Sequence, residues 1–231
     1  MSDKKSKKTS LIKGGRAAEN VRLRDKKKLK KSSQDWLERQ INDPFVQQAK
    51  KDGYRSRAAY KLIEIDENFN ILNGAKSVVD LGCAPGSWCQ YASRKLGDKA
   101  KIVGVDLKEV DSIPNCILIK GDFTENEILA DLLEKTNGKV DVVLSDMAPN
   151  STGHSRTDHL QIMYLLELAI DFAVNNLKKN GSFVAKVLQG GAEKNLLDIA
   201  KKNFAKVKHY KPKASRQESA EMYIVATGFK F

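Results

Sequence analysis

The feature that most constrains the fold is a regular alternation, after Gly74, of short β-branched apolar runs with longer runs of helical periodicity. This alternation is typical of βαβ units, in which helices connect parallel strands. The predicted strands are Ser77–Leu81, Lys101–Val105, Cys116–Lys120, Val140–Ser145, Ser182–Val187, Ala205–Tyr210 and Met222–Thr227. The predicted helices between them are Ser87–Lys95, Glu125–Lys135, Thr157–Leu177 and Ala192–Phe204. The dipeptide Asn180-Gly181 is expected to end the third of these helices.

The segment before the first strand predicts two further helical stretches. Residues 32–51, SSQDWLERQINDPFVQQAKK, are amphipathic and are expected to form a short helix that packs on the domain. A basic turn follows, and Ser56 is expected to cap a helix that continues to Phe69. Lys61 lies among the apolar positions of that helix, where a lysine ordinarily extends its ammonium group to water.

Charge predicts a polyanionic partner. The chain has 231 residues, a formal net charge of +12 and a pI near 9.5, which favours nucleic acid or an anionic membrane surface. Most of the surplus lies in residues 1–31, where lysine and arginine far outnumber acids and apolar residues are few. We expect a disordered arm that follows a phosphate backbone, with a solubilising tail as the alternative. No apolar run approaches the roughly 18 residues of a membrane span, so we expect a cytoplasmic protein.

Cysteine and histidine give no sign of a metal site or a disulfide framework. Cys83, Cys89 and Cys116 are odd in number and lack paired C-x-x-C spacing. The three histidines are scattered along the chain. We therefore predict no metal, and free cysteines that act as small apolar residues.

The stretch VVDLGCAPGSW, residues 78–88, predicts a ligand site. An apolar strand ends there in a Gly/Pro turn, and a helix follows. Ligands of parallel α/β sheets bind beyond the carboxyl ends of the strands. The spacing of Gly82 and Gly86 departs from G-x-G-x-x-G, which disfavours a nicotinamide or flavin cofactor. A tight connection without any ligand is the alternative.

Four predicted strands end in an acid or run directly into one. Because parallel strands present their carboxyl ends on one edge, we expect these acids to line one crevice. Asp106, about 25 residues after the first turn, is well placed to accept hydrogen bonds from ribose hydroxyls. Each acid is equally consistent with a helix cap. The four acids are Asp80, Asp106, Asp122 and Asp146.

These segments together resemble the FtsJ/RlmE family of S-adenosylmethionine-dependent ribosomal RNA 2′-O-ribose methyltransferases. The resemblance extends from about Ser32 to the C-terminus and predicts a methyltransferase domain over residues 32–231, after the arm at 1–31. It implies a Rossmann-like fold with a seven-stranded, mostly parallel sheet, its last strand antiparallel, and helices on both faces. The segments that carry it are SRAAYKL (56–62), VVDLGCAPGSW (78–88), GDF (121–123), LSDMAPN (144–150), FVAKVLQG (183–190) and EMYIVATG (221–228).

The resemblance also implies the site residues. S-adenosylmethionine is expected over the first turn, with Gly86 and Trp88 near its methionine end, Asp106 on its ribose and Asp122 beside its adenine. Asp146 is expected close to the sulfonium. The family's catalytic tetrad falls on Lys61, Asp146, Lys186 and Glu221. A ribose hydroxyl is a weak acid, so its methylation benefits from a group that holds its proton.

Within the tetrad we expect Lys186 to accept or direct the proton and Lys61 to position the substrate. Asp146 and Glu221 are expected to hold the two lysines. Burial and neighbouring cations would lower the pKa of Lys186, whereas the two carboxylates oppose that shift, and the sequence leaves the balance open.

An RNA substrate follows from the basic arm and from the 2′-hydroxyl that only RNA offers. The compact, bacterial type of the family implies a uridine in the A-loop of 23S rRNA in the large ribosomal subunit, with the enzyme a monomer. Alternatives are a transfer RNA 2′-O-methyltransferase, a silent RNA-binding assembly factor and a nucleotide-dependent oxidoreductase. Arg55, Arg57 and residues 201–213 can extend the basic surface, and Tyr54 or Tyr210 can stack on bases or simply pack.

Overall fold

The computed structural model describes residues 31–149, 154–189 and 194–231. The predicted basic arm at 1–31 therefore lies almost entirely outside the described residues. The chain divides into two units, Met1–Pro44 and Phe45–Phe231. In the first unit the described element is α1 (Lys31–Asn42), whose Asn42 side chain donates to the Glu38 carbonyl at 2.8 Å. The predicted domain boundary between residues 31 and 32 stays a prediction.

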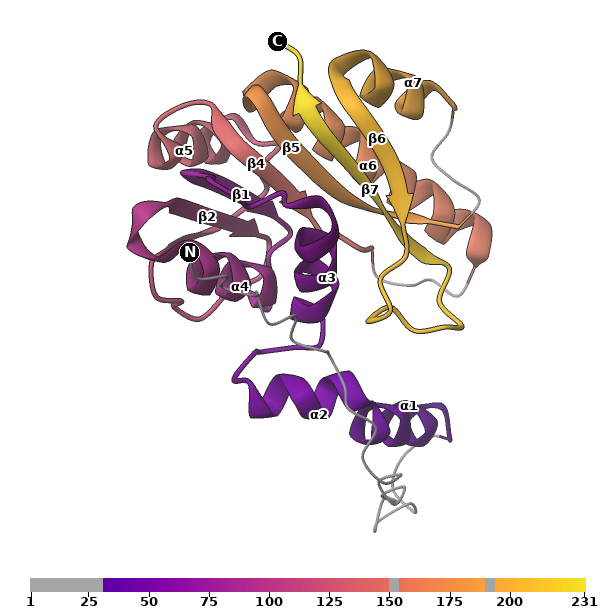
Figure 1. Ribbon diagram of the computed structural model, residues 1–231. Helices are drawn as coiled ribbons and strands as arrows, with labels where there is room; N and C mark the ends of the chain where they lie inside the picture. Colours follow the sequence, from indigo (N-terminus) through magenta and orange to yellow (C-terminus); the bar gives the residue numbers. More distant parts are fainter. Residues whose placement is uncertain (1–30, 150–153, 190–193) are drawn as a thin grey trace, which may run out of the picture. The chain divides into compact units, whose positions relative to one another are not determined.

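The second unit contains a seven-stranded sheet with the order β3-β2-β1-β4-β5-β7-β6 (Figure 1). Neighbouring strands from β3 to β5 are parallel, and β7 is antiparallel to both β5 and β6. The predicted α/β fold with an antiparallel last strand is confirmed. The strands are β1 (Ser77–Leu81), β2 (Lys101–Asp106), β3 (Cys116–Lys120), β4 (Val140–Ser145), β5 (Leu177–Leu188), β6 (Phe204–Tyr210) and β7 (Glu221–Phe229).

Helices cover both faces of the sheet, as predicted. Alternate residues of β1 divide between the faces, because side chains of a strand point to opposite sides. Val79 and Leu81 pack in one core with α5, α6 and α7, whereas Val78 packs in a second core with α3 and α4. The helices are α2 (Pro44–Lys51), α3 (Ala59–Phe69), α4 (Ser87–Leu96), α5 (Asn126–Thr136), α6 (Ser155–Asn176) and α7 (Lys194–Asn203), with a short 3-10 helix at Gly97–Lys99.

The predicted end of α6 at Leu177 is correct to within one residue, but Asn180-Gly181 is not the stop of this helix. The helix ends at Asn176, and β5 begins at once at Leu177, five residues before the predicted strand start. Asn180 does adopt the left-handed backbone that such a dipeptide favours, with φ 66°. It does so where the pairing of β4 with β5 is irregular, since Val140 pairs with Leu177 whereas Val142 pairs with Ser182.

Ser56 was predicted to cap the helix that continues to Phe69, but it is not the N-cap residue of that helix. Its Oγ accepts a hydrogen bond from the Ala58 backbone nitrogen at 3.2 Å and lies 2.7 Å from the Ser87 hydroxyl. The helix α3 begins one residue later, at Ala59, and the residue at its N-cap position makes no side-chain cap. Ser56 therefore connects the start of α3 to the start of α4. Within the described residues, no helix is long and apolar enough to cross a membrane.

Candidate active site

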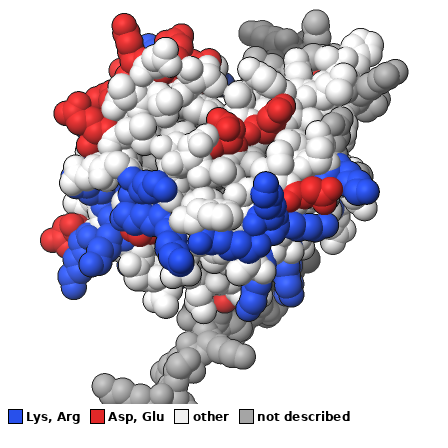
Figure 2. Space-filling model, turned by 90° about the horizontal axis from the view of Figure 1, so that it is seen from above, with Lys and Arg blue, Asp and Glu red and all other residues white. Residues whose placement is uncertain are grey.

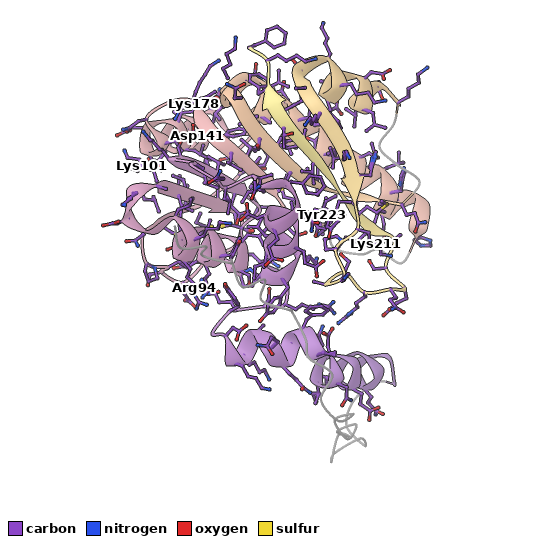
Figure 3. All side chains as sticks on the ribbon, in the orientation of Figure 1. Arg94, Lys101, Asp141, Lys178, Lys211 and Tyr223 are labelled. Carbon is purple, nitrogen blue, oxygen red and sulfur yellow. The ribbon has the colours of Figure 1, made fainter. Side chains whose placement is uncertain are left out.

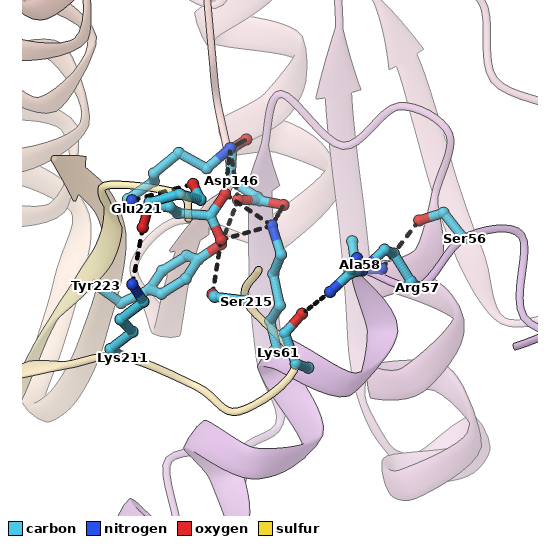
Figure 4. A network of polar contacts seen from close by, with 12 residues as sticks. Ser56, Arg57, Ala58, Lys61, Asp146, Lys211, Ser215, Glu221 and Tyr223 are labelled. Carbon is cyan, nitrogen blue, oxygen red and sulfur yellow. Dashed lines mark hydrogen bonds and ion pairs between the residues drawn. The ribbon is translucent and has the colours of Figure 1, made fainter. Parts of the chain in front are cut away.

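The four predicted tetrad residues converge at the carboxyl edge of the parallel strands. Figure 4 labels three of them, Lys61, Asp146 and Glu221. Lys61 comes from α3, Asp146 directly follows β4, Lys186 lies near the end of β5 and Glu221 begins β7. The antiparallel register places Lys186 opposite Tyr223, and Glu221 is two residues from Tyr223 on the same face of β7. Pairing of β4, β5 and β7 therefore brings together residues that are far apart in the sequence.

The four charged groups form one compact ion-pair network. Lys61 Nζ lies 2.8 and 2.9 Å from the two Glu221 carboxylate oxygens and 3.6 Å from Asp146 Oδ2. Lys186 Nζ lies 2.8 Å from Asp146 Oδ1 and donates to the Asp146 backbone carbonyl at 2.8 Å. The distance from Lys186 Nζ to Glu221 Oε2 is 3.9 Å. Each lysine thus has one close carboxylate and one more distant one.

Burial makes these interactions strong. The side chains are 12% exposed for Lys61, 17% for Asp146, 9% for Lys186 and 16% for Glu221. Burial raises the pKa of Asp146, but Lys186 and Lys61 outweigh burial and bring that pKa to about 2. Burial lowers the pKa of Lys61, but Asp146 and Glu221 outweigh it and leave that pKa above its usual value. At neutral pH Asp146 is therefore an anion and Lys61 a cation.

The first glycine turn lies beside this network, between β1 and α4. Gly82 and Gly86 have left-handed φ values of 73° and 102°. A Cβ on Gly86 would lie 2.5 Å from Cδ1 of Ile113, so another residue would require that side chain to shift in addition to adopting the left-handed backbone. Gly86 precedes the first turn of α4, whose free N–H groups and dipole favour electron-rich ligand groups at this point.

Trp88 is placed differently from the other predicted cofactor residues. Its side chain is 3% exposed, and its Nε1 donates to the Ala58 carbonyl at 2.8 Å. Its ring lies 5.7 Å from the ring of Tyr223. In this arrangement Trp88 supports the site from beneath by joining α4 to α3, and its predicted contact with a cofactor stays a prediction.

Asp106 ends β2, and Asp122 follows the end of β3. Their carboxylate oxygens can accept further hydrogen bonds. Asp106 accepts hydrogen bonds from the Ala84 and Lys108 backbone nitrogens, both at 2.8 Å. Asp122 Oδ1 accepts from the Thr124 backbone nitrogen at 2.9 Å. Both side chains fix local turns and stay partly exposed, and the N-cap position of α5 is Glu125, so Asp122 does not cap that helix.

Asp80 differs from the expectation that four acids line one crevice. It lies inside β1, is 1% exposed and has one carboxylate oxygen with no hydrogen-bond partner. Its other oxygen accepts from the Cys89 thiol at 3.3 Å. Burial raises the pKa of Asp80 to about 7. Asp80 is a core residue beneath the turn, so it does not form part of the exposed edge.

The basic and aromatic residues near this edge are engaged in packing. Arg55 donates to the carbonyls of Pro85 and Ser112 at 2.9 Å each. The Tyr54 ring lies 4.3 Å from the Arg94 guanidinium, and Tyr210 packs on Phe69 with ring centroids 5.4 Å apart. These contacts agree with the packing alternative for both tyrosines.

Residues 54–229 match the family model of the FtsJ-like methyltransferases. The chain belongs to the FtsJ-like methyltransferase family. It is 51% identical over 217 residues to ribosomal RNA large subunit methyltransferase E of Acidiphilium cryptum, covering 94% of this chain and 96% of that one. The same enzyme of Paramagnetospirillum magneticum is 52% identical over 222 residues, with 94% and 91% covered.

A crystal structure supports the same grouping. A protein of Plasmodium falciparum, described as a ribosomal RNA methyltransferase, superposes with a TM-score of 0.67 at 36% identity and covers 76% of this chain and 98% of its own. The predicted family, and the prediction that the chain is a methyltransferase, are confirmed. The individual roles predicted for the site residues stay predictions.

Two residues of this methyltransferase site were missing from the predicted set. The Tyr223 hydroxyl lies 2.7 Å from Asp146 Oδ1, to which it donates, and 3.1 Å from Glu221 Oε1. Ser215 Oγ donates to the same Glu221 oxygen at 2.8 Å. Tyr223 was within reach of sequence reasoning, because residues two apart on a strand share a face. Ser215 lies in the connection before β7, where no sequence signal indicates it.

The FtsJ-like site offers carboxylates and lysines without an arrangement for a metal. Across residues 31–149, 154–189 and 194–231, no group of three or more His, Cys, Asp or Glu side chains is placed to hold a metal ion. The cysteines Cys83, Cys89 and Cys116 are free thiols.

Proposed function

We propose that this protein transfers a methyl group from S-adenosylmethionine to the 2′-hydroxyl of a uridine ribose in the A-loop of 23S rRNA. The observation that carries the proposal is the buried network of Lys61, Asp146, Lys186 and Glu221 at the carboxyl edge of the sheet. The names of its relatives, which are ribosomal RNA large subunit methyltransferases, support the substrate class.

The chemistry of the edge fits S-adenosylmethionine. The glycine turn leaves the backbone open at the start of α4, Asp106 offers carboxylate oxygens for ribose hydroxyls, and Asp122 offers an acceptor for an adenine amino group. Asp146, an anion with a pKa of about 2, suits a nearby sulfonium. When bound, the cofactor supplies an electrophilic methyl group. Gly86 and Trp88 complete the proposed cofactor set.

The residues of the chain then have separate tasks. Lys61, held by both oxygens of Glu221, is a fixed cation that positions the substrate. Lys186, held by Asp146, accepts or directs the proton that leaves the 2′-hydroxyl as its oxygen attacks the methyl carbon. Orientation of the hydroxyl supplies much of the rate. The tetrad thus orients a lone pair of the 2′-oxygen toward the methyl carbon and takes or directs the hydroxyl proton.

The test is transfer of a tritium-labelled methyl group to large ribosomal subunits from cells that lack the modification, followed by mapping of the methylated ribose. Lys186→Met is expected to reduce transfer at least a hundredfold, in line with general acid–base contributions, while calorimetry shows unchanged cofactor binding. Near-normal transfer by this variant would refute the role of Lys186.

The other readouts separate the alternative functions. Labelling of transfer RNA would overturn the substrate, and cofactor binding without transfer to any RNA would favour a silent assembly factor. Ribosome assembly implies a cytoplasmic enzyme, and we further propose that it acts as a monomer.

A further inference from the structure

The edge of the sheet opposite the candidate active site carries a row of lysines. The parallel strands begin at this edge, and the register pairs Ser77 with Lys101 and Val140 with Leu177. Exposed lysines lie at, or within about two residues of, these strand starts. We call them the lysine band: Lys76, Lys99, Lys101, Lys139, Lys178 and Lys179.

The figures place the band away from the chemistry. In Figure 3, Lys101 and Lys178 lie at one edge of the sheet, whereas Tyr223 lies toward the other. Figure 2 looks down on the molecule from above Figure 1 and shows Lys and Arg side chains running as a continuous row across that face. Since strands of five or six residues rise about 3.3 Å per residue, the two edges are about 20 Å apart through the protein.

Most of the charge in the band is not neutralised. Asp141 lies at this edge, and its carboxylate pairs with Lys178 at 3.3 Å while also accepting from the Lys76 and Ser77 backbone nitrogens. By contrast, Lys101, Lys139 and Lys179 make no side-chain hydrogen bond or ion pair within the described part of the chain. Their ammonium groups are therefore available to another molecule.

Stabilisation of helix ends does not account for these three lysines. The helices α4, α5 and α6 end at Leu96, Thr136 and Asn176, and a helix dipole favours cations only in the last turn. The last turns of α4 and α5 already contain Lys95 and Lys135. The band lysines come after the helix ends, in the connections and the first strand positions.

The spacing of the band suits a nucleic-acid backbone. Its members lie at or just before the starts of the neighbouring strands β2, β1, β4 and β5, and neighbouring strands are about 4.8 Å apart. The row of strand starts therefore spans about 14 Å, a length over which one duplex strand presents about four phosphates. Lysine ammonium groups on flexible stems pair with phosphates without a fixed geometry.

We propose that the lysine band is a second RNA-docking surface, which binds the phosphate backbone of a ribosomal RNA segment other than the one that carries the methylated ribose. The proposal rests on the proposed function for the identity of the RNA. An RNA hairpin held at the carboxyl edge does not reach the opposite edge without wrapping around the domain. A folded ribosomal subunit presents several RNA segments at once and can occupy both edges.

The test compares two double variants of equal charge: Lys139→Gln/Lys179→Gln in the band, and Lys50→Gln/Lys51→Gln, which are exposed in the last turn of α2, as a control. Binding to unmodified large ribosomal subunits is measured against potassium chloride concentration. Loss of two phosphate contacts is expected to lower the slope of log Kd against log salt by about 1.8 and to raise Kd ten- to fiftyfold at about 0.1 M salt. The control pair is expected to bind as the unaltered protein does.

Further readouts separate this proposal from its alternatives. With saturating subunits, methyl transfer by the band pair is expected to keep its kcat, and binding of a short A-loop hairpin is expected to stay unchanged. An unchanged Kd for subunits, with or without a lower melting temperature, would overturn the proposal. Equal weakening in both pairs, or equal weakening toward the hairpin, would overturn it as well.

The same experiments distinguish a failure of the proposed function from a failure of the docking proposal. If the unaltered protein binds subunits but transfers no methyl group, the assigned reaction is wrong, while the comparison of the two variant pairs still decides whether the band docks RNA. If the unaltered protein does not bind large subunits, the band is not a docking surface for this RNA.

Discussion

Replacing Tyr223 by phenylalanine removes one oxygen from the buried charge network and leaves its ring in place. The hydroxyl donates to Asp146 Oδ1 at 2.7 Å, and the side chain is fully buried, so no water is at hand to replace it. A hydrogen bond to a charged group contributes about 1.5–3 kcal/mol. Asp146 keeps its contact with Lys186 at 2.8 Å, so the loss should lie at the low end of that range, at about 1.5 kcal/mol.

Tyr223→Phe should also affect catalysis, because the Asp146 carboxylate loses the hydrogen bond from the Tyr223 hydroxyl. The hydrogen bond from Tyr223 is one of the interactions that lower the pKa of Asp146, so that pKa should rise in Tyr223→Phe. A less firmly held Asp146 orients Lys186 less well. If the full loss of about 1.5 kcal/mol is expressed in the transition state, kcat falls roughly tenfold, and the acid limb of its pH profile moves to higher pH.

Urea unfolding and steady-state methyl transfer measure the two effects, and Tyr210→Phe is the matched control. The Tyr210 hydroxyl accepts from the exposed Asn68 side chain at 3.1 Å, so its removal should change stability by less than about 0.5 kcal/mol. A Tyr223→Phe variant with unaltered kcat and an unmoved acid limb would show that the hydroxyl does not position Asp146, even if stability fell.

Two further predictions concern stability. The pKa of Asp146 is about 2 in the folded protein against an ordinary 3.8, so its stabilisation is complete above pH 3.8 and is lost as pH falls toward 2. Between pH 5 and pH 2 the free energy of unfolding should fall by about 2 kcal/mol more in the unaltered protein than in Asp146→Asn, and parallel urea-derived curves would refute this. Gly86→Ala should cost about 1–3 kcal/mol more than Gly74→Ala in thermal unfolding. Both glycines have positive φ, but a Cβ meets Ile113 at 2.5 Å in the first and open space in the second, so equal losses would contradict the contact argument.

The sheet was predictable because each of its strands is marked by its own local sequence pattern. Val140–Ser145 and Cys116–Lys120 are short apolar, β-branched runs between turn residues, and the structure has strands with these bounds. The error at Asn180-Gly181 has the same local origin. The dipeptide correctly signals a left-handed residue, but a helix end and an irregular stretch of strand pairing both accept one, and only the pairing of β5 with β4 decides between them.

The sequence predicted which residues form the tetrad, but it did not predict the hydrogen bonds and ion pairs between them. The tetrad followed from the family resemblance, which carries residue identities without geometry. That Asp146 binds Lys186 through both its carboxylate and its backbone carbonyl depends on how β4 and β5 end side by side. The part played by Ser215 depends on the path of the connection between β6 and β7, which no periodic pattern encodes.

The charges in the network limit which tetrad residue can take the proton that leaves the 2′-hydroxyl. Asp146, with a pKa of about 2, is too weak a base to hold a proton at neutral pH, and Lys61, with its pKa raised, stays protonated. Both Glu221 oxygens already accept from Lys61, and one also accepts from Ser215. Lys186 donates to two oxygens of the single residue Asp146 and lies 3.9 Å from Glu221 Oε2. The contacts therefore set Asp146 and Lys61 apart as fixed charges, and the proposal that Lys186 handles the proton of a ribose hydroxyl is the one that the Lys186→Met variant tests.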